Sequence, residues 1–242
     1  MNDHELAAQL ATAAGRLLLE VRAELSDAPA ADRKAQGDKR SHDFLMAQLA
    51  RTRPDDAVLS EEGADNPVRL TAKRVWIIDP VDGTREFSEL GRDDWAVHVA
   101  LWERGDLVAG AVALPGQGVT IATPEVPAPS IHAGAPRILV SRTRPPAVAV
   151  QVCDALGGTL VEMGSAGAKV AAVVQGRAEV YVHAGGQYEW DSAAPVAVAR
   201  AAGLHTSRID GTALRYNQSD PLLPDVLVCQ SQFAEAVLNA IR

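Results

Sequence analysis

One stretch in the first half of the chain constrains the fold more than any other. Residues 76–87 read WIIDPVDGTREF. An apolar run of the kind found in buried strands ends here in two carboxylates with a proline between them. Pro80 fixes its own φ and keeps Asp79 out of the helical region, so we expect the strand to end in a sharp, rigid corner. Asp79 and Asp82 would then converge on one point.

The residues after this corner favour a turn that can face an anion. Asp82-Gly83 is a turn dipeptide, and Thr84 stands where a helix could begin. The backbone N–H groups of Gly83 and Thr84 would be free to face an anion there. Two carboxylates, a carbonyl between them and these amides describe a site for a hard cation and a phosphate. An ordinary surface turn is the alternative, because Asp-Gly is common in turns.

Composition restricts the class of protein. The 242 residues suffice for one large domain or two small ones, and 47% apolar residues indicate a globular chain. The net charge of −8 argues against a nucleic acid polymer as partner. Cys153 and Cys229 form neither a disulfide framework nor a zinc motif. The polar N-terminus and the lack of an apolar run near ~18 residues predict a cytoplasmic protein with no membrane contact.

The hydrophobic periodicity predicts a helical start, an antiparallel meander and an α/β second part. We expect helices at 3–21 and 37–51 with a loop at 26–32 between them. Strands follow at 57–60, 73–78, 95–101, 107–114 and 119–122. After a proline-rich linker at 124–136, strands at 138–141, 159–163, 178–184 and 226–229 alternate with helices at 147–156, 165–175, 191–202 and 232–241.

Three motifs in the same order resemble the inositol monophosphatase superfamily, whose members are magnesium-dependent, lithium-sensitive phosphatases. They are Glu61-Glu62, the motif at 79–84, and Trp190-Asp191-Ser192-Ala193-Ala194. The extension at 85–87 is similar to the CysQ-type branch, the 3′(2′),5′-bisphosphate nucleotidases; inositol monophosphatases more often carry Asn where Glu86 stands. The resemblance implies an α/β (α+β) fold, the layered α-β-α-β-α sandwich of the inositol monophosphatase and fructose-1,6-bisphosphatase type.

Within this fold we expect two parts. An N-terminal α+β half, residues 1–133, would carry most of the metal ligands. A C-terminal α/β half, residues 134–242, would carry Asp191 and the substrate contacts. The acids Glu61, Asp79, Asp82 and Asp191 all lie at the ends of predicted core elements, where a cleft between the halves would be.

Four carboxylates at close range would repel one another, so they would either take up protons or bind a cation. Oxygen-only ligation without His or Cys points to Mg²⁺. The resemblance implies two or three ions, one held by Glu61, Asp79, the Val81 carbonyl and Asp82, and a second by Asp79, Asp82 and Asp191. Glu61 and Glu62 at a strand end would point to opposite faces, and the superfamily uses Glu61. Asp191 begins a predicted helix, so it could be an N-cap, a ligand or both.

Asp38 lies at the start of the helix predicted at 37–51. A cap or first-turn acid, favoured by the helix dipole, is one reading. The resemblance implies that Asp38 activates the attacking water together with Thr84, its hydrogen-bond partner. The superfamily usually has Thr three residues before this aspartate, and this chain has Ala35 after a short loop.

Two further segments are candidates for binding substrate. Ser141-Arg142-Thr143-Arg144 follows a predicted strand, and a solvated basic loop is the alternative reading. Small residues at 164–168 precede Lys169, and they would let the backbone approach a ligand. The resemblance implies that Ser141, Arg144, Ser165 and Lys169 contact nucleotide phosphate or ribose, alongside Gly83 and Thr84. We read none of His98, His132, His183 and His205 as a ligand or nucleophile.

The resemblance implies a phosphomonoester hydrolase that converts 3′-phosphoadenosine 5′-phosphate to AMP and phosphate, within sulfate assimilation. Inositol-1-monophosphatase or fructose-1,6-bisphosphatase activity is the first alternative. A non-catalytic module that binds phosphometabolites is the second, and Ala35 with the short loop before Asp38 is its only support. The expected partner is a small phosphate ester, and the sequence leaves a homodimer open.

Overall fold

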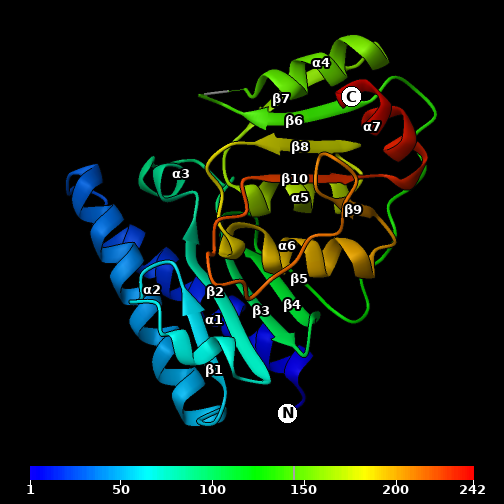
Figure 1. Cartoon of the computed structure of the whole chain (residues 1–242). Helices are drawn as coiled ribbons and strands as arrows, with labels where there is room; N and C mark the ends of the chain where they lie inside the picture. Colours follow the sequence, from blue (N-terminus) through cyan, green and yellow to red (C-terminus); the bar gives the residue numbers. More distant parts are fainter. Residues whose placement is uncertain (144) are drawn as a thin grey trace.

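The computed structural model describes residues 1–143 and 145–242. Two five-stranded sheets alternate with three helical layers, which confirms the expected α-β-α-β-α sandwich (Figure 1). Arg144, one of the predicted substrate contacts, lies outside the described residues. In the described part of the chain, no helix combines the length and the apolar character needed to cross a membrane.

The first sheet has the order β1-β2-β3-β4-β5. β1 runs parallel to β2, and the other neighbours pair antiparallel, so the predicted meander is confirmed. The strands are β1 Ala57–Ser60, β2 Arg74–Asp82, β3 Ala96–Glu103, β4 Asp106–Leu114 and β5 Val119–Ala122. Short 3₁₀ helices lie at η1 Pro67–Leu70 and η2 Pro115–Gln117, and α3 Thr84–Ser88 follows β2.

Both faces of the first sheet are buried, because a helix pair covers each. Val97 and Val99 of β3 pack with α1 Asp3–Glu24 and α2 Ala30–Thr52, whereas Ala96 and Ala100 belong to the core on the opposite side. There α5 Ala166–Val174 and α6 Glu189–Ala201 pack between the two sheets (Figure 1). Alternation along the strand therefore separates two cores instead of a core and solvent.

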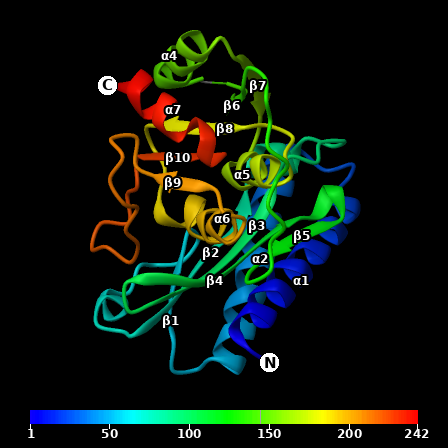
Figure 2. The same ribbon diagram turned by 90° about the vertical axis from the view of Figure 1, so that its right-hand side faces the viewer.

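The second sheet has the order β7-β6-β8-β10-β9. β6 is parallel to β7 and β8, and β10 is antiparallel to β8 and β9. Its outer face is covered by α4 Ala147–Leu156 and α7 Ala234–Ile241 (Figure 2). The strands are β6 Arg137–Ser141, β7 Thr159–Met163, β8 Val180–Ala184, β9 His205–Ser207 and β10 Asp225–Cys229, and η3 Ser231–Phe233 precedes α7.

One helix boundary differs from its sequence-based prediction by more than three residues. α2 begins at Ala30 instead of residue 37. Residues 30–36 are therefore helical, and the first three of them belong to the loop expected at 26–32. Arg33 stabilises this early start, because its buried guanidinium donates to the carbonyls of Leu25, Ser26, Ala28 and Ser88. These partners lie outside the helix, so local propensity could not reveal them.

Candidate active site

A bulge in β2 brings together Asp79 and Asp82 of the central motif, residues 76–87. Asp79 pairs with His98 and Asp82 with Ala96, so β2 holds three steps where β3 holds two. In a regular strand, residues three apart point to opposite faces. The extra residue turns Asp82 to the face that Asp79 already uses. The predicted sharp corner is thus wrong in form, since the pairing of β2 with β3 continues to Asp82, but the convergence that it implied is present.

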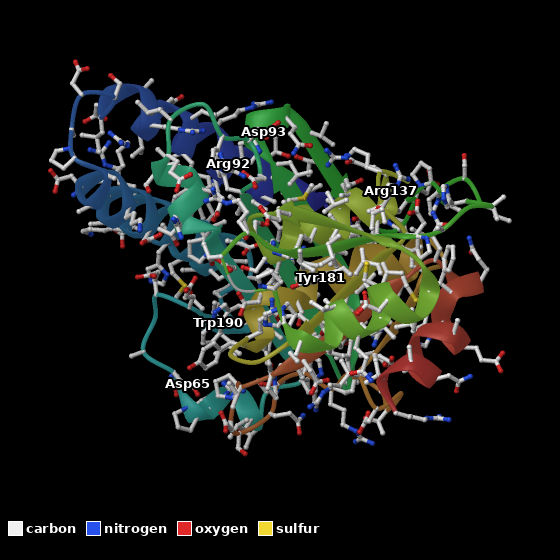
Figure 3. All side chains as sticks on the ribbon, turned by 90° about the horizontal axis from the view of Figure 1, so that it is seen from above. Asp65, Arg92, Asp93, Arg137, Tyr181 and Trp190 are labelled. Atoms are coloured by element: carbon white, nitrogen blue, oxygen red, sulfur yellow. The ribbon has the colours of Figure 1, made fainter. Side chains whose placement is uncertain are left out.

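Three carboxylates meet on this face. Oxygens of Asp79, Asp82 and Asp191 all lie within 4.8 Å of one another. Asp79 and Asp82 come from β2, and Asp191 from the first turn of α6, which packs on the same side of the sheet. Trp190, next to Asp191, lies near the middle of the molecule in the view from above (Figure 3). The structure therefore brings the DPVD motif and the WDSAA motif to one place.

Asp82 is held by a set of donors from the start of α5. Its carboxylate accepts hydrogen bonds from the Ser165 hydroxyl, the Ala166 N–H at 3.1 Å and the Gly167 N–H. The start of this helix thus binds a protein carboxylate. Burial alone would raise the pKa of Asp82, but His98 and these donors lower it to about 2. Asp82 is therefore the ionised anchor of the cluster.

The pKa values of Asp79, Asp191 and the nearby Glu61 are shifted in the opposite direction, above their ordinary values. Burial raises the pKa of Asp79 well above its ordinary value, and the nearby Glu61 and Asp82 charges add to this. Burial and Asp82 raise the pKa of Asp191 to about 7. Burial, together with Glu62 and Asp82, raises the pKa of Glu61 to about 7, although part of its side chain is exposed. Burial and mutual repulsion among the carboxylates thus act in the same direction at all three positions.

Two expectations about individual acids need correction. Glu61 and Glu62 lie in a turn after β1, which ends at Ser60, so strand alternation does not separate them. Glu61 still lies close to the cluster, since its charge raises the pKa of Asp79. Asp191 is the third residue of α6, and its carboxylate accepts the Tyr188 N–H at 2.7 Å. It is a capping residue as well as a member of the cluster.

Asp38 is not at a helix start, because α2 begins eight residues earlier. The first-turn reading is therefore wrong. Burial first and Glu62 second raise the pKa of Asp38 to about 7. The preceding residue, Gly37, lets α2 approach α3 closely, since a Cβ there would lie 2.4 Å from Phe87 Cε1.

Thr84 makes a different hydrogen bond from the one expected. Its hydroxyl donates to the Val81 carbonyl at 3.2 Å. Within the described residues, no hydrogen bond joins Thr84 to Asp38. Their joint action on a water therefore stays a prediction. The Val81 carbonyl, which we expect to bind a metal, accepts this hydrogen bond from Thr84.

The predicted substrate residues that the structure describes lie in different surroundings. Gly83 has φ +82°, and a Cβ there would lie 3.0 Å from Ser165 Cβ, so the DG turn and the 164–165 turn are in close contact. Ser141 lies at the end of β6 and lines a 550 Å³ cavity with Thr143, His183 and Gln187. Lys169 is buried, and its ammonium donates to the carbonyls of Met163, Gly164 and Ser165 at 3.4, 3.2 and 2.7 Å.

Sequence reasoning missed two contributors. His98 is fully buried with Nε2 3.1 Å from Asp82 Oδ2, while Nδ1 lies 3.0 Å from the Trp190 carbonyl. An isolated histidine in an apolar strand gives no signal of such a partner. Glu86, in contrast, belongs to the central motif. The sequence gives no sign of its ion pair with Arg142, which lies 56 positions away.

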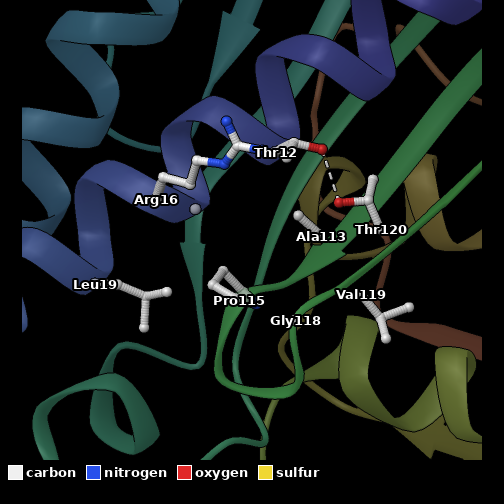
Figure 4. A pocket seen from close by; sticks show the side chains of 9 residues that line it. Thr12, Arg16, Leu19, Ala113, Pro115, Gly118, Val119 and Thr120 are labelled. Carbon is white, nitrogen blue, oxygen red and sulfur yellow. Dashed lines mark hydrogen bonds between the residues drawn. The ribbon is translucent and has the colours of Figure 1, made fainter.

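A second cavity, of 270 Å³, lies between α1 and β5 and is lined by Thr12, Arg16, Leu19, Pro115 and Val119 (Figure 4). The acids of the cluster do not line it. The carboxylates of the cluster themselves fit a hard divalent cation, because they offer oxygen ligands at short mutual range and repel one another when ionised.

Comparisons with known proteins agree with this architecture. The sequence model of the inositol monophosphatase family matches residues 3–126 and 137–242. The 3′-phosphoadenosine 5′-phosphate phosphatase of Mycobacterium leprae (strain TN) is 50% identical over 256 residues, which cover 100% of this chain and 94% of that protein.

A more distant relative is the 3′(2′),5′-bisphosphate nucleotidase CysQ of Shigella flexneri, 32% identical over 76% of this chain and 79% of its own length. Among solved structures, inositol monophosphatase II from Staphylococcus aureus MSSA476 superposes with a TM-score of 0.84 at 21% identity, over 99% of this chain and 92% of that one. This likeness concerns the fold alone. The chain belongs to the inositol monophosphatase family, in its CysQ-type branch.

Proposed function

We propose that this protein is a phosphoric monoester hydrolase that converts 3′-phosphoadenosine 5′-phosphate to AMP and phosphate. One observation carries the proposal: the Asp79, Asp82 and Asp191 oxygens converge within 4.8 Å in a chain half identical to a phosphatase of that name. Electrostatic stabilisation of a transferring phosphoryl group is what such a cluster can support once cations compensate its charge.

We further propose Mg²⁺ as the cation, in two or three ions. Glu61, Asp79, Asp82, Asp191 and the Val81 carbonyl would hold them. Bound there, the ions would supply positive charge against the phosphate and acidify water nearby. Inhibition by Li⁺ that Na⁺ does not reproduce belongs to the same proposal, since the family resemblance implies it. Asp82 is prepared for this role, because its partners on α5 keep it ionised.

Asp38 and Thr84 are the proposed groups that take the proton from the attacking water. Asp38 projects from the middle of a long helix, where its backbone needs no capping from the side chain. Its carboxyl is therefore available for proton transfer. The Thr84 hydroxyl would remain able to accept a hydrogen bond while it donates to Val81.

The phosphate that does not react needs binding partners of its own. We propose Ser141, Ser165, Lys169 and Arg144 for this role, with the Gly83 and Thr84 amides at the reacting phosphate. The 550 Å³ cavity beside Ser141 offers the space. Lys169 would have to exchange one of its three carbonyl partners for the substrate.

The test is a panel of phosphate esters with purified protein and Mg²⁺. We expect kcat/KM for 3′-phosphoadenosine 5′-phosphate to exceed that for inositol 1-phosphate and fructose 1,6-bisphosphate. A higher value for either sugar phosphate would replace the nucleotidase proposal by that activity. No phosphate release from any ester would leave only a binding module. Sedimentation and cell fractionation would test the proposals of a homodimer and a cytoplasmic location.

A further inference from the structure

An ion pair outside the acid cluster joins α3 to the loop after β6. Arg142 donates from Nε and Nη2 to Glu86 Oε1, at 3.0 and 2.7 Å. Nη2 also lies 3.2 Å from both carboxylate oxygens of Glu89. Glu86 is 8% exposed, so this contact is shielded from water more than a surface pair would be.

The protein is built closely around the Glu86 side chain. A Cβ on Gly164 would lie 2.2 Å from Glu86 Cγ, and one on Gly83 would lie 3.4 Å from Glu86 Oε2. Gly164 is itself fixed, since its N–H donates to Asp94 at 2.6 Å. Glu86 therefore touches both turns that carry proposed phosphate contacts, and its ion pair reaches a third segment.

That third segment forms a wall of the 550 Å³ cavity. Ser141 and Thr143, on either side of Arg142, line it together with 183–187. The hydroxyls of Ser141 and Thr143 bond only each other's residue in the described part of the loop. Besides the pairing of β6 with β7, the side-chain bonds of Arg142 connect this wall to α3, which follows the aspartates of the acid cluster.

We propose that Glu86 and Arg142 act as a positioning pair that sets the substrate preference of the enzyme. By fixing the 141–143 loop against α3, the pair holds the cavity wall at the distance where a substrate can engage it with its second anionic group while its reacting phosphate sits at the acid cluster. The proposal rests on the proposed function, because it names which part of the bisphosphate the pair serves.

The test compares Glu86→Gln, which keeps the shape and removes the charge, with wild type on two substrates. For 3′-phosphoadenosine 5′-phosphate we expect KM to rise roughly ten- to hundredfold, the range of a charge-assisted contact, with kcat little changed. p-Nitrophenyl phosphate has no second anionic group, so its kcat/KM should stay at the wild-type value. Glu24→Gln is the matched control, since it makes the same substitution in an exposed ion pair with Arg40.

A second set of variants keeps the test decisive if Glu86→Gln folds poorly. Arg142→Lys retains the charge but loses the forked geometry. It should raise KM for 3′-phosphoadenosine 5′-phosphate less than Arg142→Met does. The double variant Glu86→Gln/Arg142→Met should raise this KM no more than the worse single variant, because both substitutions remove the same contact. Thermal unfolding measures the folded fraction in each case.

The outcomes separate the two proposals. Equal losses on both substrates, or a fall in kcat at constant KM, would overturn the positioning role and leave the proposed function intact. If wild type shows no preference for the bisphosphate, the proposed function fails. The variants are then measured on the ester that wild type prefers. A rise in KM confined to that ester supports the positioning role of the pair, and a rise shared with p-nitrophenyl phosphate rejects it.

Discussion

His98 Nε2 lies 3.1 Å from Asp82 Oδ2 at a point where both side chains are buried. The contact is one of charge, because Nε2 has no hydrogen-bond partner of good geometry among the described residues. Burial alone would lower the pKa of His98, but Asp82 and the Trp190 carbonyl raise it. The histidine thus joins the strand that carries Asp82 to the helix that carries Asp191.

This contact requires glycine on the neighbouring helix. A Cβ at position 167 would lie 2.0 Å from His98 Nε2. We expect Gly167→Ala to lower the free energy of unfolding by about 1–3 kcal/mol, because α5 or His98 must move. Urea unfolding measures this. Gly157→Ala is no suitable control, because Gly157 has φ +61°. Gly63→Ala is the control, because a Cβ there would come no closer than 3.4 Å to the nearest side chain. If Gly167→Ala is as stable as wild type, the packing described here is wrong.

Removing one acid from the cluster should separate stability from activity. For Asp191→Asn we expect kcat to fall at least about a hundredfold, because a ligand of the cation is lost. The metal-free variant should be no less stable than wild type, since one repelling charge is gone and the Asn side-chain oxygen can still accept the Tyr188 N–H. Phosphate release and thermal unfolding in EDTA give the two values. Normal turnover at saturating Mg²⁺ would remove Asp191 from the site.

Asp38→Asn should distinguish a base from a ligand. We expect turnover to be lost by roughly 10²- to 10⁴-fold, the range of general base catalysis, while Mg²⁺ affinity stays the same. Isothermal titration with Mg²⁺ is the deciding measurement, because collapse of the affinity would make Asp38 a ligand. Asp43→Asn, on the exposed face of the same helix, is the control. Retained activity would reject both roles.

The Arg208–Asp225 pair predicts an acid-dependent loss of stability away from the site. Burial would raise the pKa of Asp225, but Arg208 and the Ile209 N–H lower it below its ordinary value of 3.8. A lowered folded-state pKa stabilises the protein above pH 3.8, and this contribution disappears as the pH falls through the folded-state pKa.

We therefore expect Asp225→Asn to be about 1–2 kcal/mol less stable than wild type at pH 7, a value reduced for the partly exposed Arg208. The difference should shrink below pH 3.8. Denaturant unfolding at pH 7 and pH 3 measures it, and a difference that grows on acidification would contradict the assignment. Asp43→Asn, in an exposed pair with Lys39 on α2, serves as the control.

The periodic elements and the chemistry of the central motif could be predicted from the residues alone. Strand alternation in 95–122 and the helix–strand alternation after residue 137 reflect burial patterns that local residues carry. The convergence of Asp79 and Asp82 was also predicted, from a corner at Pro80, although a bulge in β2 is what produces it. The identity of the ligand atoms needed no more than the residue types.

Other features became visible only in the folded chain: the bulge in β2, the early start of α2, and the partners of His98, Glu86 and Arg33. Each depends on groups far apart in the chain. Arg33 stabilises a helix start where the composition of 26–32 suggested a loop, because it binds the Ser88 carbonyl as well as carbonyls in the preceding turn. His98 looked like one more core residue until Asp82 was placed beside it. Local preferences amount to roughly tenths of a kcal/mol per residue, and a buried charge without a partner costs several, so packing determines such positions.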